Sequence, residues 1–220
     1  MIPPDQNGQF VACMEKVLDI YKRQYDANFP VICMDESPKQ LIRETRQPLS
    51  TRCGSIERYD YEYERCGICN IFMANEPLTG NRIVEIYERK TKIEWAYFIE
   101  KILQYYESAT KIILVMDNLS THKAGSFYDA FPPEKAKSIY ERFEFVYTPK
   151  HGSWLNMAEI ELNVLHKQCL NRRIDCIDTV RDEVVAWQNH RNTQNATINW
   201  QFTTEDARIK LKRLYPTLQS

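Results

Sequence analysis

An aspartate directly follows each of two short apolar runs, and two such carboxylates could form a catalytic site. Asp35 follows VICM, and Asp117 follows KIILVM. Because the crevice of an open α/β sheet lies beyond the carboxyl ends of its strands, two acids there can converge on one site. A single aspartate at a strand end is more often a turn or cap residue, since its side chain bonds to nearby backbone amides. Two in equivalent positions favour a shared site.

A third acid would complete a site for phosphoryl transfer. Two Mg²⁺ ions roughly 3.5 to 4 Å apart can bind the attacking and leaving oxygens, and such ions need carboxylate oxygens as ligands. The segment KHGSWLNMAEIELNVL offers Glu159 and Glu161. On a helix Glu159 shares a face with polar residues such as Asn156 and His166, which favours it. Glu161 shares its helix face with apolar residues. A carboxylate on such a face could be the one buried against the sheet near metal ions, which favours Glu161 instead. Periodicity leaves both open.

The elements that must position these acids follow from the hydrophobic pattern. Apolar residues at helical spacing predict helices over 9–24, 93–107, 154–171 and 178–191, with a proline-interrupted helical segment over 123–141. Apolar runs predict strands at 30–35, 111–117 and 143–147, and a hairpin is predicted from 59–74 and 82–87. A basic, proline-containing loop is expected between the first strand and the hairpin. The order predicts an α/β fold with a mixed sheet of about five strands flanked by helices. The ribonuclease H-like layout is one candidate among several.

Three motifs resemble the catalytic domain of DDE transposases, specifically the bacterial insertion sequence 630 branch of the mariner superfamily. The motifs are MDES at 34–37, LVMDNLSTH at 114–122 and TPKHGSWLNMAEIE at 148–161. An Asp-Asn pair followed by a histidine, here Asp117, Asn118 and His122, is a hallmark of that superfamily. Its third acid ends a short motif that begins with Leu and Asn, and this motif ends on Glu159 here. The resemblance therefore selects Glu159 and leaves Glu161 an expected structural role.

The resemblance implies a ribonuclease H-like fold and a metal-dependent transposase. Such an enzyme cleaves DNA at transposon ends and joins the 3′-hydroxyl to target DNA. Asp35, Asp117 and Glu159 are the expected catalytic residues and metal ligands, with two Mg²⁺ ions in the active complex and Mn²⁺ as a substitute. The residues expected to contact DNA are Asn118, His122, Lys150, His151, Arg172 and Arg173. For His122, a packing or capping role is an equal alternative.

The resemblance also sets the expected partners and domains. The partners are the transposon ends and target DNA, and synapsis of two ends makes a dimer on DNA the expected assembly. A linker helix is expected over 1–27, the catalytic domain over 28–200, and a C-terminal helix or tail over 201–220. We expect the helix-turn-helix region that reads the inverted repeats in such transposases to be absent from this chain. We therefore expect the chain alone to bind its own ends poorly.

The composition excludes several other classes of protein. With 220 residues, 43% of them hydrophobic and 27% charged, the chain resembles an ordinary globular protein. A net charge of -1 means that DNA contact must come from local patches. The start lacks signal-peptide features, the apolar runs are too short to cross a bilayer, and the seven cysteines fit reduced thiols. We expect a location in the bacterial cytosol, associated with the nucleoid, and no membrane partner.

Two other functions remain open. A ribonuclease H-like nuclease would use the same acids but cleave without joining. A non-catalytic DNA-binding fragment of a transposase would be marked by the loss of an acid, and all three acids are present.

Overall fold

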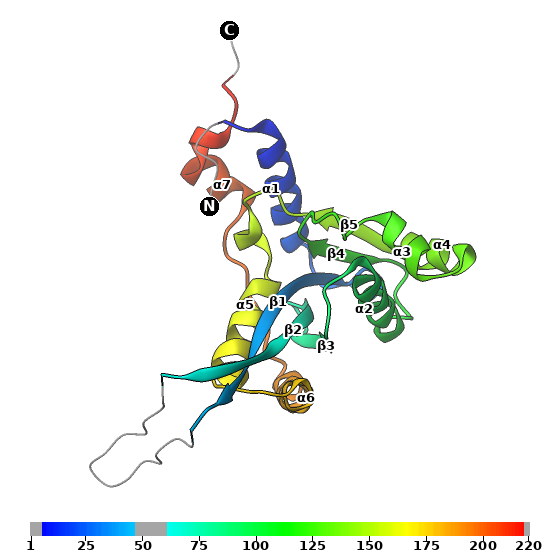
Figure 1. Ribbon diagram of the computed structural model, residues 1–220. Helices are drawn as coiled ribbons and strands as arrows, with labels where there is room; N and C mark the ends of the chain where they lie inside the picture. The colour runs from blue at the N-terminus through cyan, green and yellow to red at the C-terminus, as the bar shows by residue number, and fades with distance from the viewer. Residues whose placement is uncertain (1–5, 47–60, 218–220) are drawn as a thin grey trace.

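One five-stranded sheet forms the centre of the computed structural model, which describes residues 6–46 and 61–217 (Figure 1). The strands are β1 (Val31–Glu44), β2 (Tyr63–Glu76), β3 (Asn81–Tyr87), β4 (Ile112–Met116) and β5 (Phe143–Tyr147). Their order is β3-β2-β1-β4-β5. Strands β1, β4 and β5 are parallel, and β2 is antiparallel to both β1 and β3. The predicted mixed sheet of about five strands is confirmed.

Helices cover both faces of this sheet (Figure 1). One face carries α2 (Lys92–Tyr105), α3 (Ala124–Ala130) and α4 (Pro133–Glu141). On the other face, α1 (Gly8–Tyr21) and α7 (Thr204–Lys210) pack near β4 and β5. The same face carries α5 (Ala158–Leu165) and α6 (Ile177–Thr193) over β2 and β3. Shorter helical turns are η1 (Ser153–Leu155), the π-helix η2 (His166–Leu170) and η3 (Lys212–Leu214).

The predicted helical segments are present in the structure. The segment 123–141 is divided into α3 and α4 at its two prolines, because proline lacks an amide hydrogen and is favourable at the first position of a helix. Within 6–46 and 61–217, no helix is long and apolar enough to cross a membrane.

The side chains of successive residues in β1 point to opposite faces of the sheet. Ile32 and Met34 are buried in the core under α2, α3 and α4, whereas Cys33 is buried in the core that includes α1. Side chains alternate along a strand. Asp35 therefore follows Cys33 onto the face of α1 and α5, and Glu36 follows Met34 onto the opposite face. This alternation separates two neighbouring acids.

The first strand continues well beyond its predicted end. The apolar run predicts a stop at Asp35 and then a basic loop, but β1 runs to Glu44. Residues 47–60 of that loop lie outside the described ranges. β4 pairs with only the first three residues of β1, whereas β2 pairs with it from Cys33 to Glu44. Beyond Cys33 no strand of the described residues pairs with the other edge of β1, where the amide of Ile42 donates to the backbone oxygen of Ile174 (2.8 Å). Pro38, which lacks an amide hydrogen, lies in this stretch with one paired edge.

The helix that carries the two glutamates begins later than predicted. Periodicity predicts one helix over 154–171, but the structure has η1, a break at Asn156, α5 from Ala158, and then η2. The backbone of Asn156 is extended. Its buried side chain donates to the backbone oxygen of Met34 (2.8 Å) and accepts from the amide of Ala158 (3.2 Å). The side chain thus replaces helical hydrogen bonds and ties the start of α5 to β1.

Candidate active site

The two strand acids lie next to the point where β1 and β4 separate. In the parallel ladder Cys33 is opposite Val115, and Asp35 and Asp117 each lie two residues further along. Asp117 directly follows β4, and Asp35 lies inside β1 just past its last pair with β4. The equal offset brings the two predicted residues together on one face of the sheet.

Glu159 approaches the same place from the first turn of α5. Its side chain is partly buried. The approach is fixed by Asn156, whose side chain holds the backbone oxygen of Met34, the residue before Asp35. Carboxylates from two strands and one helix thus share one region, here called the acidic site (Asp35, Asp117 and Glu159).

The acidity of Asp35 is strongly perturbed in the acidic site. Burial is the main cause that raises the pKa of Asp35 to about 6. A hydrogen bond from the amide of Glu36 (2.8 Å) opposes the shift, and the negative charges of Asp117 and Glu159 add to it. Among the described residues, neither Asp35 nor Glu159 forms an ion pair. The site carries more negative charge than nearby side chains balance, which favours a bound cation.

His122 lies behind Asp117 and is only 2% exposed. Its Nδ1 is 2.7 Å from Oδ1 of Asp117, and its Nε2 is 3.1 Å from Oε1 of Glu36. Burial lowers the pKa of His122, but Asp117 and Glu36 outweigh burial and raise the pKa to about 9. The ring is therefore an imidazolium at neutral pH. The DNA contact of His122 stays a prediction, and the side chain for which it is predicted lies buried between Asp117 and Glu36.

The acidic site has the ligand chemistry that hard divalent cations prefer. Oδ1 of Asp117 is buried against His122, which leaves Oδ2 as the carboxylate oxygen that can face solvent in a side chain 33% exposed. Mg²⁺ and Mn²⁺ take carboxylate oxygens, and Asp35 and Glu159 supply two more such groups. In the part of the chain described, no three acidic, histidine or cysteine side chains are close enough to form a complete metal-binding group. Cation binding would have to draw the three carboxylates closer.

Glu161, the other candidate on α5, has different surroundings. It is 1% exposed and accepts hydrogen bonds from Nε of Arg82 in β3 (2.5 Å) and from Nη2 of Arg191 in α6 (3.0 Å). Burial raises the pKa of Glu161, but hydrogen bonds from the two arginines outweigh burial and lower it. A carboxylate paired with two guanidinium groups is not available to a metal ion. We call Arg82, Glu161 and Arg191 the arginine cluster.

Three of the predicted DNA-contact residues lie at the exposed surface. Asn118, Lys150 and His151 are all exposed, and Asn118 accepts a hydrogen bond from Lys123. Asn118 and Lys150 line a groove of about 200 Å³ between the start of α1 and the segment after β5. His151 has a left-handed backbone, with φ of 66°. These side chains are accessible to a phosphate group.

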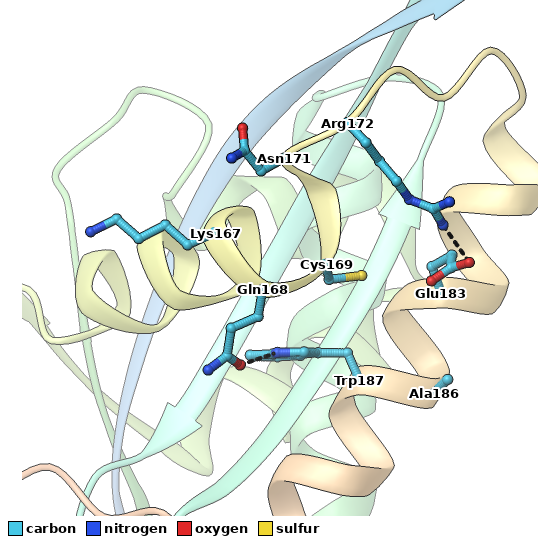
Figure 2. Close-up of a pocket in the computed structure, with 8 residues that line it drawn as sticks. All are labelled: Lys167, Gln168, Cys169, Asn171, Arg172, Glu183, Ala186 and Trp187. Carbon is cyan, nitrogen blue, oxygen red and sulfur yellow. Dashed lines mark hydrogen bonds and ion pairs between the residues drawn. The ribbon is translucent and has the colours of Figure 1, made fainter. Parts of the chain in front are cut away.

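Arg172 and Arg173 have acidic partners within the protein. Arg172 pairs with Glu183 of α6 at 2.5 Å, beside a groove of about 330 Å³ between η2 and α6 (Figure 2). Arg173 pairs with Glu44 at the end of β1 at 2.5 Å. No residue of the acidic site lines this groove. Any DNA contact by these arginines would compete with ion pairs that join segments of the fold.

The residues that surround His122 carry no signal in the sequence that they contact one another. Glu36 is adjacent to Asp35, and strand alternation is the one clue that it faces elsewhere. Lys90 pairs with Glu36 at 2.9 Å, and Trp95 stacks on His122 with ring centroids 5.3 Å apart. Each partner comes from a distant segment, so no local pattern predicts the contact.

A protein family matches most of the chain. The family described as DDE superfamily endonuclease matches residues 30–181. A sequence comparison with curated proteins found no match.

Solved structures similar to this chain include complexes of Mos1. The Mos1 mariner paired end complex with Mn aligns over 89% of this chain and 61% of its own, with a TM-score of 0.58 and 14% identity. The Mos1 Strand Transfer Complex aligns over 89% and 60%, with a TM-score of 0.58 and 13% identity. The paired end complex with Mg aligns over 99% and 66%, with a TM-score of 0.58 and 14% identity. The likeness establishes the ribonuclease H-like fold, and this chain spans 60% to 66% of the length of these relatives.

Proposed function

The chain belongs to the DDE superfamily endonuclease family, and from this premise we propose that it is the catalytic part of a transposase. It cleaves DNA at transposon ends and joins the new 3′-hydroxyl to target DNA. The observation that carries the proposal is the acidic site, where three carboxylates share one region and two of them lack an ion pair within the described residues. The likeness to the Mos1 complexes, which include a strand transfer complex, adds support.

We assign Asp35, Asp117 and Glu159 as the catalytic residues and as the ligands of Mg²⁺, with Mn²⁺ as a substitute. The Mos1 structures with Mg and with Mn support this choice of ions. Two such ions, when bound, stabilise the charge that develops on the attacking and leaving oxygens of a phosphate. Hard carboxylate oxygens are the ligands these ions prefer.

Other residues of the chain hold and surround these ligands. Asn156 fixes the start of α5, so that Glu159 stays beside Asp35. Asn118, the residue after Asp117, and Lys150 line one surface groove. There they can contact backbone phosphates and position the DNA. His151, Arg172 and Arg173 remain predicted DNA contacts.

We also propose the partners and the domain limits. The catalytic domain spans 28–200, with a linker helix over 1–27 and a C-terminal helix or tail over 201–220. The partners are transposon ends and target DNA, and a dimer on DNA brings two ends together. The paired end complexes of Mos1 support such an assembly. The insertion sequence 630 branch stays a prediction from the motifs.

Two assays test cleavage and joining separately. Nicking of a supercoiled plasmid in Mn²⁺ measures cleavage, and transfer of a labelled oligonucleotide with the element's terminal sequence and a free 3′-hydroxyl into that plasmid measures joining. The variants are Glu159→Gln and, as a matched control on the same helix, Glu161→Gln. Circular dichroism establishes that each is folded. We expect Glu159→Gln to lose both reactions and folded Glu161→Gln to keep both.

Two outcomes would change the proposal. Normal nicking by Glu159→Gln, together with its loss in folded Glu161→Gln, would contradict the assignment of the third acid. Nicking by the wild type without joining would favour the alternative of a ribonuclease H-like nuclease.

A further inference from the structure

A buried chain of polar side chains runs behind the acidic site, from Lys90 through Glu36 and His122 to Asp117. We propose that Glu36 and His122 are positioning residues, which fix the carboxylate of Asp117 in the orientation that a divalent cation requires. This inference rests on the proposed function, because it assigns these residues a role toward its metal site. Neither residue touches the reacting atoms.

The geometry connects the two faces of the sheet. Asp35 and Asp117 belong to the face of α5, whereas the side chain of Glu36 lies on the opposite face. His122 bridges the faces, with Nε2 3.1 Å from Oε1 of Glu36 and Nδ1 2.7 Å from Oδ1 of Asp117. One oxygen of Asp117 is thereby occupied, and the other is left for a ligand. Within the described residues, Glu36 is linked to Asp117 through His122.

The histidine ring is itself held in place on several sides. It stacks on Trp95 with the ring planes 25° apart, and the hydroxyl of Tyr147 donates to its backbone oxygen at 2.9 Å. Its backbone amide bonds to the oxygen of Leu119 at 3.1 Å. A ring fixed in this way limits rotation of the Asp117 carboxylate. Partners of metal ligands commonly orient them in this manner.

Burial argues against a role in packing alone. The side chains of Glu36 and His122 are each 2% exposed, and the aromatic core that includes Trp95 and Phe127 lies beside them. Apolar residues of similar volume would fill this space without the desolvation cost of a buried carboxylate and a buried imidazole. Lys90 pairs with Glu36 at 2.9 Å and offsets part of that cost. Orientation of Asp117 gives a reason for the charges to be there.

Binding of Mn²⁺ alone to the full chain tests the proposal, measured by the loss of the free-ion signal in electron paramagnetic resonance. Glu36→Gln keeps the shape and removes the charge, and His122→Phe keeps the ring against Trp95 and removes both nitrogens. We expect each variant to bind Mn²⁺ about 10- to 100-fold more weakly than wild type. A merely structural role would leave the affinity of the folded protein unchanged.

Glu76→Gln is the matched control. Glu76 is also a buried glutamate of the sheet, 2% exposed, and it is held by Thr79, Asn81 and Tyr106 away from the acidic site. We expect this variant to lose stability comparably to Glu36→Gln but to bind Mn²⁺ like wild type. Equal Mn²⁺ affinity of wild type, Glu36→Gln and His122→Phe would overturn the proposal.

Asp117→Asn separates this proposal from the proposed function. If Asp117→Asn weakens Mn²⁺ binding but the Glu36 and His122 variants do not, the metal site stands and the positioning role fails. If Asp117→Asn binds like wild type, or wild type does not bind Mn²⁺, the ligand assignment itself fails and the positioning role fails with it.

Discussion

Glu159 and Glu161 lie two residues apart on α5 but have opposite electrostatic surroundings. Glu161 has two arginine partners in the arginine cluster. Glu159 joins Asp35 and Asp117 in the acidic site and has no ion pair among the described residues. The difference teaches that charge balance separates the two roles more clearly than helical periodicity does. The balanced carboxylate of Glu161 joins segments of the fold, and carboxylates without such partners are the better candidates for cation ligands.

The two clusters should also respond differently to substitution. Removing one member of a buried, balanced cluster leaves a charge without its partner, which is strongly destabilising. Removing one carboxylate from a site with excess negative charge relieves repulsion. Changes in the arginine cluster should therefore reduce stability, and changes in the acidic site should reduce activity.

The largest expected effect is that of Asp35→Asn on activity. We expect the rate of Mn²⁺-dependent plasmid nicking to fall by about a thousandfold, because a metal site contributes several kcal/mol of transition-state stabilisation. The midpoint of thermal unfolding should stay the same or rise, since Asp35 is buried near two other negative charges. A nicking rate equal to that of wild type would remove Asp35 from the site.

The next largest effect is that of Glu161→Ala on stability. We expect the free energy of unfolding, measured in urea, to fall by about 3 to 5 kcal/mol because Arg82 loses its buried partner. As a control, Glu44→Ala breaks the more exposed pair with Arg173 and should cost no more than about 1 kcal/mol. Equal losses in the two variants would show that the arginine cluster has no special role.

The pH dependence of stability should differ in sign between the clusters when divalent cations are removed by a chelator. The pKa of Asp35 is raised from 3.8 to about 6, so its contribution makes the protein more stable as pH falls from about 6 towards 3.8, and this gain is lost again as pH rises through 6. The pKa of Glu161 is lowered from 4.5, so its contribution is present above that value and is lost as pH falls below it.

Urea unfolding midpoints between pH 7 and pH 3.5 measure both contributions. Asp35→Asn should remove the gain in stability as pH falls from about 6 towards 3.8, and Glu161→Gln should remove the loss below pH 4.5. The same pH profile in wild type and both variants would contradict the two assignments.

The smallest expected effect is that of Glu205→Gln. Lys22 lies 2.5 Å from Glu205, and a hydrogen bond from Lys22 is the main cause that lowers the pKa of Glu205 to about 2. Both side chains are exposed, so solvent and salt screen the pair. We expect no measurable change in the thermal midpoint at physiological salt. A clear loss would mean that surface pairs matter here as much as the arginine cluster.

Much of the fold follows from local pattern. The strands before Asp35 and Asp117 are buried on both faces, so they read as continuous apolar runs. The second half of β1 has no such signal, because beyond Cys33 it pairs only with β2 and its sequence is polar. The apolar pattern therefore predicts the strand only as far as Asp35.

Less of the candidate site than of the fold can be predicted from the sequence. The helical comparison of Glu159 with Asn156 assumed one continuous helix, and Asn156 instead lies in an extended break. The partners of Glu161 are Arg82, 79 residues away, and Arg191, 30 residues away. Neither separation falls within one element, so only the folded chain reveals which glutamate is already neutralised.

The parallel ladder between β1 and β4 is only three residue pairs long, and the alignment of the two strand acids depends on it. Deleting one residue between Cys33 and Asp35 would turn Glu36 toward Asp117 and reverse the faces of everything after it. Inserting two residues would keep the faces but shift Asp35 by about 6.6 Å along the strand. Evolution can therefore change the side chains in this stretch more freely than its length, and natural insertions should collect elsewhere, in loops such as the one between α3 and α4.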